Sequence, residues 1–344
     1  MLSSVVSTGI LLALLGPNQQ LTTDEQRVWG QIKPRVAYLN VAGRQSGVAS
    51  LIDERGYFIV HRSVAPLPGS FALAQLGTGQ SIQLNFVSED ELTQLALLQS
   101  VGFSGGFRRD EKGKFDTPLS GRSQKDSNQL LAVMPNGPLR AELSFSNRMG
   151  VMKPSNRGVT LNEYRFETPS YSLAGALLFN MDGGLVGVLG ATLEPTDNQG
   201  TGAGGSVPRG GAGSALSAPT AGRSNSFGPG AMTVAYAITP DILSRVIEGF
   251  LSPSHKVAHP AIGVFCINAK GGGVVVDSVT KGSNAEKAGI QQGDIIKEMS
   301  GSPIQTTSDF FKVIIRQTVG STIRVTLVRG TEERKIDVVV GATS

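Results

Sequence analysis

The chain has 344 residues, 40% of them hydrophobic and 17% charged, and this composition predicts that most of it folds into two or three domains. Its net charge of +4 is small and its basic residues are interleaved with acidic ones, which argues against a nucleic-acid-binding surface. With one cysteine, Cys266, and three histidines, the chain forms no intrachain disulfide and gives no support for a zinc cluster, so we expect no metal and no cofactor.

An apolar run from Val5 to Leu15 stands near the N-terminus. It is too short to span a bilayer and has about the length of a signal-peptide core. We therefore expect residues 1–20 to be a signal peptide, although no Lys or Arg precedes the run and Pro17 follows it in place of a small residue. The alternatives are a mis-assigned start of the chain and a helix packed on the following domain.

A short helix is predicted after this segment. Thr22 and Glu25 have the spacing of a capping box, which satisfies the first backbone N–H groups of a helix. Val28 and Ile32 share one apolar face, and Pro34 ends the helix.

Short runs of alternating apolar and polar residues, separated by Gly, Asp and Asn, follow the predicted helix. The clearest of these runs are 35–43, 48–64, 81–88, 92–101, 128–134, 140–146, 157–168 and 184–193. Strands with turn signals at this density predict an all-β barrel or sandwich.

The segment 195–231 is rich in Gly, Ser, Pro, Ala and Thr, a composition that predicts flexibility because it cannot bury a core. The segment 232–251 then predicts a strand that runs into a helix, with Pro240 near the start of the helix. Because that strand would pair best with the preceding strands, we interpret 195–231 as a loop inside one domain. The linker to the last domain is then 252–260.

The last part of the chain, 261–344, is rich in strand patterns and has two helical segments, 284–290 and 308–317. Ser308 is the expected N-cap of the second segment. The tetrapeptide GDII at 293–296 stands between them. These features, in this order, resemble the signature of the PDZ domain.

The resemblance implies a carboxylate-binding loop at 261–265. Gly263 would let backbone N–H groups turn toward a chain-terminal carboxylate, and the strand after it would pair with a bound peptide. Two apolar residues one turn apart on the second helix would wall a side-chain pocket, or else pack into the core. The implied peptide-binding residues are Ile262, Gly263, Val264, Phe265, Ile267, Phe311 and Ile315.

The domain before it, 21–251, resembles the trypsin-like domain of HtrA/DegP-type serine proteases, which also precedes a PDZ domain. The matching stretches are 33–39, 47–64, 88–99, 172–188 and 234–243. The resemblance implies a mainly β chain, with a trypsin-like double β-barrel followed by the smaller, mixed α/β PDZ domain.

Carried over residue by residue, the catalytic histidine of the family falls on Ser63, its aspartate on Gln94 and its nucleophilic serine on Ala174. A methyl group is no nucleophile, a hydroxyl takes no proton at neutral pH, and an amide cannot stabilise an imidazolium. Ser172 replaces the glycine two positions before the nucleophile, which puts the oxyanion hole in doubt. The resemblance therefore implies a protease fold that has lost its catalytic triad.

Three weaker arrangements keep an active enzyme open as the alternative function. His61, two residues before Ser63, is an alternative base, but a histidine at the end of a strand is expected to be exposed there. Ser104 sits in an imitation of the nucleophile motif, yet it follows Gln94 too closely. Ser172 has no evident base. An HtrA-type serine endopeptidase would need one of these non-standard arrangements.

The predicted function is peptide binding. The PDZ groove, and the vacant substrate cleft with it, would bind protein C-termini and unfolded segments, as a scaffold, a chaperone-like holder or a regulator. The resemblance implies a homo-oligomer or a hetero-oligomer with an active relative. It also implies an extracytoplasmic location, periplasmic or secreted, with membrane association through the N-terminal apolar segment left open. A purely structural protein, whose own tail or linker fills the groove, is a further alternative.

Overall fold

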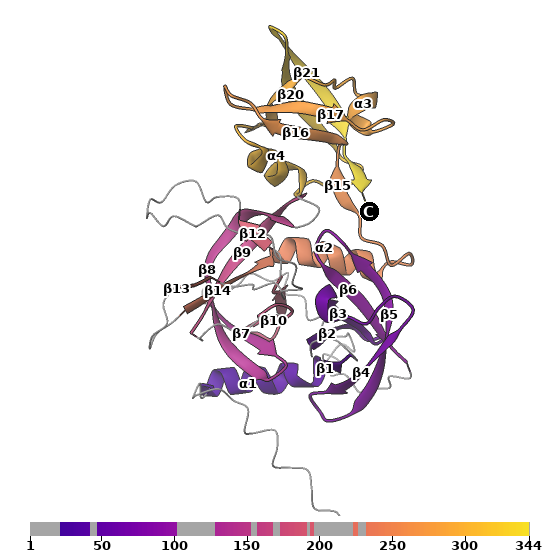
Figure 1. Cartoon of the computed structure of the whole chain (residues 1–344), viewed down its shortest axis with the longest axis vertical. Coiled ribbons are helices and arrows are strands. Elements are labelled where there is room, and N and C mark those ends of the chain that lie inside the picture. The colour runs from indigo at the N-terminus through magenta and orange to yellow at the C-terminus, as the bar shows by residue number, and fades with distance from the viewer. Residues whose placement is uncertain are drawn as a thin grey trace, which may run out of the picture.

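The computed structural model describes residues 21–41, 47–101, 128–152, 157–167, 173–190, 193–195, 223–225 and 232–343. The expected signal peptide, most of the Gly/Ser-rich segment and the two alternative serines, Ser104 and Ser172, lie outside these residues. Figure 1 shows two β-rich lobes side by side and a smaller body above them, coloured orange to yellow. Within the described residues, no helix is both long and apolar enough to span a membrane.

The first lobe is a closed barrel with the strand order β1-β2-β3-β6-β5-β4. Its strands are β1 (Val36–Asn40), β2 (Gly47–Asp53), β3 (Tyr57–His61), β4 (Phe71–Leu76), β5 (Ser81–Asp90) and β6 (Leu95–Ser100). Every residue of β3 is buried, whereas β4 alternates strictly between exposed and buried side chains. The second pattern follows because only one face of β4 meets the core.

The second lobe is a twisted sheet in the order β11-β10-β7-β8-β9-β14-β13, with β12 paired to β8. Its strands are β7 (Gln129–Met134), β8 (Gly137–Met152), β9 (Arg157–Phe166), β10 (Leu177–Asn180), β11 (Leu185–Val188), β12 (Leu193–Pro195), β13 (Arg223–Asn225) and β14 (Met232–Ile238). β14 pairs with β9 from Thr233 to Ile238. The strand that follows the Gly/Ser-rich segment therefore belongs to this sheet, as predicted.

Helix α1 (Thr23–Ile32) begins with the predicted capping box and is fastened to the second lobe. The Glu25 carboxylate accepts the Thr22 backbone N–H at 2.8 Å. Arg140 of β8 donates to the same carboxylate at 2.6 and 2.8 Å. This hydrogen bond is the main reason that the pKa of Glu25 lies below its ordinary value.

The apolar core shared by the two lobes is closed by two helices. Val28 and Ile32 of α1 are fully buried in it. Helix α2 (Pro240–Leu251), which has Pro240 at its first turn, contributes Val246 and Phe250 to the same core. Because both lobes contribute strands to this core, it fixes the two lobes relative to each other.

The upper body contains a sheet in the order β16-β17-β18-β20-β21, with β19 on β18 and two helices. The elements are β16 (Val264–Asn268), β17 (Val274–Val279), α3 (Asn284–Lys287), β18 (Ile295–Met299), β19 (Ser302–Pro303), α4 (Thr307–Ile314), β20 (Thr322–Arg329) and β21 (Glu332–Val339). The predicted N-cap of α4 was wrong: Thr306 caps it and forms a capping box with Asp309. Ser308 lies within the first turn.

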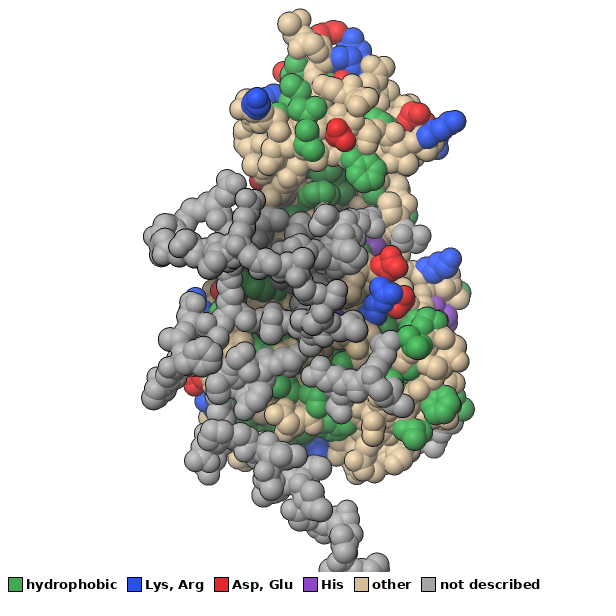
Figure 2. Space-filling view, in the orientation of Figure 1, with side chains coloured by type: hydrophobic (Ala, Val, Ile, Leu, Met, Phe, Trp, Pro, Cys, Tyr) green, Lys and Arg blue, Asp and Glu red, His purple; other side chains and the backbone are tan. Residues whose placement is uncertain are grey.

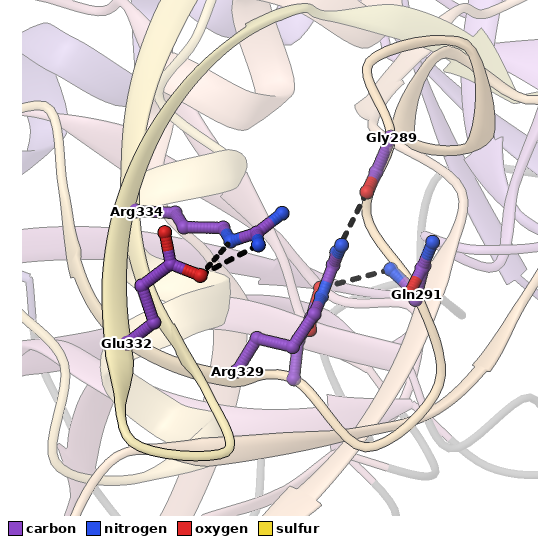
Figure 3. Close-up of polar contacts among 6 residues, drawn as sticks. Gly289, Gln291, Arg329, Glu332 and Arg334 are labelled. Atoms are coloured by element: carbon purple, nitrogen blue, oxygen red, sulfur yellow. Dashed lines mark hydrogen bonds and ion pairs between the residues drawn. The ribbon is translucent and has the colours of Figure 1, made fainter.

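The GDII tetrapeptide has a structural role in this body (Figure 3). The Asp294 carboxylate accepts the Gln291 backbone N–H at 2.8 Å and two hydrogen bonds from Arg329, at 2.7 and 2.8 Å. Arg329 also donates to the Gly289 carbonyl at 2.8 Å. Although burial acts to raise the pKa of Asp294, these bonds hold it below its ordinary value. The network thereby ties the loop after α3 to the end of β20.

Candidate functional site

Ser63 and Gln94 lie in two turns that are joined by a backbone hydrogen bond. Ser63 is exposed in a short 3₁₀ turn, η2 (Arg62–Val64), at the end of β3. The Arg62 N–H donates to the Gln94 carbonyl at 2.8 Å. Gln94 has a positive φ of 59°, and its side-chain amide donates to the Glu91 carbonyl at 2.9 Å. The Gln94 side chain is therefore engaged with its own turn.

The turn that carries Ala174 reaches the same place from the second lobe. Gly175, with φ +82°, packs so closely that a Cβ there would lie 3.4 Å from the Cβ of His61. The Gly175 N–H donates to the Leu189 carbonyl at 2.8 Å, which fixes the turn against the residue that follows β11. Ala174 is half-buried and presents a methyl group.

His61, expected to be exposed, is 2% exposed, because the turn from the second lobe covers the end of β3. Its Nδ1 accepts the Ser63 backbone N–H at 3.2 Å and lies 2.8 Å from the Ser63 hydroxyl. Because Nδ1 is an acceptor, the ring proton is on Nε2, which is buried without a hydrogen-bond partner among the described residues. Burial lowers the pKa of His61 to about 4.

The chemistry available to these groups is limited. A general base works best when its pKa is near the operating pH, so an imidazole with a pKa of about 4 accepts a proton poorly at neutral pH. Ala174 offers a methyl group in place of a nucleophile, and Gln94 offers a neutral amide. His61 instead caps the 3₁₀ turn that holds Ser63.

The predicted carboxylate loop is a tight turn that leads into an edge strand. Gly263 has a positive φ of 87°, and its carbonyl accepts the Thr280 N–H at 2.9 Å. Ile262, before it, is 3% exposed and belongs to the core of this body. β16, after it, pairs with β17 on one side, and no described strand covers its other side. Such an edge can accept a further strand through its backbone.

The side chains of β16 alternate between two faces. Val264 and Cys266 are partly buried and pack against the core of this body. Phe265 and Ile267 are 66% and 56% exposed on the opposite face. Cys266 was not among the predicted binding residues, although the period of two in a strand would have found it. Burial raises the pKa of its thiol to about 12, so the thiol is neutral.

The two residues predicted on α4 lie at the contact with the second lobe. Phe311 packs against the core of its own body and against Gly158 of β9, where a Cβ would lie 2.5 Å from the Phe311 Cγ. Ile315 is 6% exposed and packs with the core of the lobes. Its carbonyl accepts a hydrogen bond from Arg245 of α2 at 2.5 Å. Ile315 therefore joins the two bodies.

The predicted linker is fastened to the first barrel. β15 (His259–Ala261) pairs with β22 (Gly341–Thr343). The His259 Nε2 lies 2.8 Å from the Asp90 carboxylate, and both side chains are 5% exposed. Burial acts to raise the pKa of Asp90, but hydrogen bonds from His259 and Thr93 hold it below its ordinary value. The Ser88 hydroxyl donates to the His255 carbonyl at 2.7 Å, which adds a second attachment.

Comparison with known proteins identifies the upper body. The PDZ domain family matches residues 260–340. This match covers the predicted carboxylate loop, the edge strand β16 and helix α4.

Most of the chain is similar to serine proteases named HtrA or DegP-like. Serine protease Do-like HtrA of Lactococcus lactis subsp. lactis (strain IL1403) is 21% identical over 290 residues, 76% of this chain and 62% of the relative. The protein of the same name from Bacillus subtilis (strain 168) is 22% identical over 322 residues, 85% of this chain and 62% of the relative. A probable periplasmic serine endoprotease DegP-like of Rhizobium meliloti (strain 1021) is 23% identical over 309 residues, 87% of this chain and 53% of the relative. The chain thus spans only part of the length of these relatives.

Solved structures show the same arrangement. The HtrA-type protease AlgW with decapeptide has a TM-score of 0.62 and 15% identity, covering 93% of this chain and 98% of that one. The serine endoprotease from Yersinia pestis has a TM-score of 0.59 and 17% identity, covering 95% of this chain and 100% of that one. Residues 260–340 are therefore a PDZ domain, and the chain as a whole has the HtrA-type fold, a mainly β, trypsin-like double barrel that leads into that domain.

Proposed function

We propose that this chain is a catalytically inactive HtrA-like protein that binds the carboxyl-terminal ends of peptides and unfolded proteins in its PDZ domain. The observation that carries the binding proposal is the edge strand β16, preceded by the left-handed turn at Gly263. A ligand strand can satisfy its backbone groups along that edge, and its carboxylate can lie at the turn. AlgW, which shares this fold at low identity, has been solved with a decapeptide.

The proposal of catalytic inactivity rests on the residues found where the two lobes meet. Ala174 supplies no nucleophile, and the neighbouring imidazole, His61, has a pKa of about 4 and caps a turn. Among the described residues, an active arrangement would need the exposed Ser63 hydroxyl to transfer its proton to that imidazole. The resulting imidazolium would place a charged N–H in a buried site without a partner, which is energetically costly. The active endopeptidase is therefore the weaker candidate.

A purely structural protein, whose own chain fills the PDZ groove, is likewise a weaker candidate than a peptide-binding protein. The chain segment Gly341–Thr343 pairs with β15, which precedes the predicted carboxylate loop in the sequence, and these two strands form a sheet separate from that of β16. It is thereby engaged away from the edge of β16 that a ligand would use.

The proposal also covers the domain boundaries, the cellular location and the assembly of the chain. We place residues 1–20 as a signal peptide, 21–251 as the protease-fold domain, 252–260 as the linker and 261–344 as the PDZ domain. An extracytoplasmic location agrees with the name of the Rhizobium meliloti relative, a probable periplasmic endoprotease. Assembly into a homo-oligomer, or into a hetero-oligomer with an active relative, would make the chain a scaffold or a regulator.

The test is the dependence of binding on the terminal carboxylate. A fluorescent peptide ending in valine is prepared as the free acid and as the carboxamide, and each is titrated with the full chain by anisotropy. Because charge-assisted hydrogen bonds hold the carboxylate, we expect the amide to bind at least about tenfold more weakly, or about 1.4 kcal/mol. Equal affinities, or no binding of either peptide, would contradict the proposal.

A further inference from the structure

The outer surface of the first barrel carries large apolar side chains that no described element covers. Strand β4 points Phe71 and Leu73 away from the barrel core, and these side chains are 54% and 62% exposed. Val101, directly after β6, is 62% exposed. Figure 2 shows green side chains over this barrel, at the lower right of the view. Neighbouring exposed apolar side chains of this size commonly mark an interaction surface.

The strand registers place these side chains on one face. Leu73 pairs with Asn40 of β1 on one side and with Gln83 of β5 on the other. The Val101 N–H donates to the Gln83 carbonyl at 3.3 Å, which continues the same row past β5. Residues that face each other across antiparallel strands point to the same side of the sheet. We call this surface the β4 face, and its members are Asn40, Phe71, Leu73, Gln83, Asn85 and Val101.

The β4 face is uncharged. The sequence has no Asp, Glu, Lys, Arg or His from position 63 to position 88, although 17% of the chain is charged. Two ion pairs stand at borders of the face. Arg62 pairs with Glu89 of β5 at 2.9 Å, and Arg55 pairs with Asp53 at 2.8 Å in the hairpin that is bonded to the end of β6. A partner of strong charge would therefore find no complementary charge on this face.

A second copy of the same chain suits this face, because a two-fold contact brings a surface against its own equivalent. A face with a net charge would repel itself in such a contact, whereas the β4 face brings no like charges together. Its polar members are amides, which both donate and accept hydrogen bonds. The Gln83 amide N–H already donates to the Asn85 side-chain oxygen at 2.8 Å, which holds both side chains on the face. Identical amides on two copies can therefore bond with each other.

The size of the β4 face limits the strength of such a contact. The 6 residues of β4 span about 20 Å, and the neighbouring strands from β1 to β6 span about 19 Å across. The face therefore offers at most about 400 Å² per copy, or about 800 Å² for two copies. This area lies at the lower end for specific interfaces and is typical of weak, reversible association.

We propose that two copies of this chain form a weak two-fold dimer through their β4 faces, with a dissociation constant in the micromolar range. The contact leaves the PDZ domain available, because β16 lies in the upper body of the chain (Figure 1). Each dimer then presents two PDZ domains, so a ligand with two binding segments is held more tightly than by one chain. The dimer itself does not depend on the proposed peptide binding.

The experiment measures the mass of the full chain in solution by sedimentation equilibrium, between about 1 and 100 μM, where a micromolar dimer dissociates. The variants are Leu73→Asp, Leu73→Lys, and an equimolar mixture of the two. Val339→Asp is the matched control, because Val339 is an apolar residue, 47% exposed, on β21 of the PDZ domain. Circular dichroism checks that each variant is folded, and the same pair of changes at Phe71 repeats the test on a second residue.

We expect the mass of the unchanged chain to rise with concentration from 36.0 kDa toward twice that value. Leu73→Asp and Leu73→Lys should each weaken association at least about tenfold, because like charges would meet across the two-fold contact. The mixture should associate again, because opposite charges then meet, and Val339→Asp should behave as the unchanged chain. A chain that stays monomeric, association that the Leu73 variants leave unchanged, or a mixture that stays monomeric would overturn the inference. The binding of a free-acid peptide by the Leu73 variants tests the proposed function separately.

Discussion

Replacing Gly263 by alanine is expected to lower the affinity of the full chain for a free-acid peptide by at least about tenfold. Gly263 has a φ of +87°, a conformation that residues with a Cβ adopt only under strain. A Cβ there would also overlap the Cβ of Ser283, the N-cap of α3. The turn must therefore shift, and with it the backbone N–H groups that we propose bind the ligand carboxylate.

The matched control for this change is Gly271→Ala, in the loop between β16 and β17 of the same domain. Gly271 lacks a positive φ, and a Cβ there would meet no atom within 4 Å. Anisotropy titration should give the control the affinity of the unchanged chain, and circular dichroism should show both variants folded. If Gly263→Ala binds as tightly as Gly271→Ala, the carboxylate loop has been placed wrongly.

His259→Ala is expected to reduce the free energy of unfolding by about 1.5–3 kcal/mol at neutral pH, the range for a hydrogen bond to a charged group. His259 and Asp90 form a buried pair at 2.8 Å, with both side chains 5% exposed. Removal of the imidazole leaves the Asp90 carboxylate buried beside Thr93, without its hydrogen bond from His259. Chemical denaturation followed by circular dichroism measures the loss.

An exposed ion pair in the PDZ domain serves as the control for the stability loss expected of His259→Ala. Arg324 and Asp337 lie 2.8 Å apart, with side chains 65% and 53% exposed, so Arg324→Ala should reduce the free energy of unfolding far less than His259→Ala does. The pKa of Asp90 is lowered in the folded state, so its contribution is full above the ordinary aspartate value of about 3.9 and is lost as the pH falls through the folded pKa. Equal losses for the two variants at neutral pH would contradict the buried pair.

The sequence predicted those parts of the fold that depend on residues near one another in the chain. Alternating runs located most strands of the first barrel, and Thr22 with Glu25 located the start of α1. The strand before Pro240 and its pairing with the preceding sheet were also correct. The N-cap of α4 was missed, although Asp309, three residues after Thr306, completes a capping-box signal that could have found it.

Parts of the candidate site depend on contacts between distant segments, which the sequence does not reveal. His61 is buried because Gly175, from the other lobe, packs over the end of β3. Ile315 contacts the lobes because the PDZ domain docks through α4, and no local pattern distinguishes that contact from a ligand pocket. His259 and Asp90 are brought together by the same docking.

The most direct test of the account is hydrolysis of unfolded casein by the full chain, with a fluorophosphonate probe for reactive serines applied in parallel. The account predicts neither turnover nor labelling, under conditions in which an active trypsin-like protease shows both, because Ala174 supplies no nucleophile and His61 is a weak, buried base. Casein cleavage together with labelling that disappears on changing Ser63, Ser104 or Ser172 would contradict it and identify the chain as an active endopeptidase.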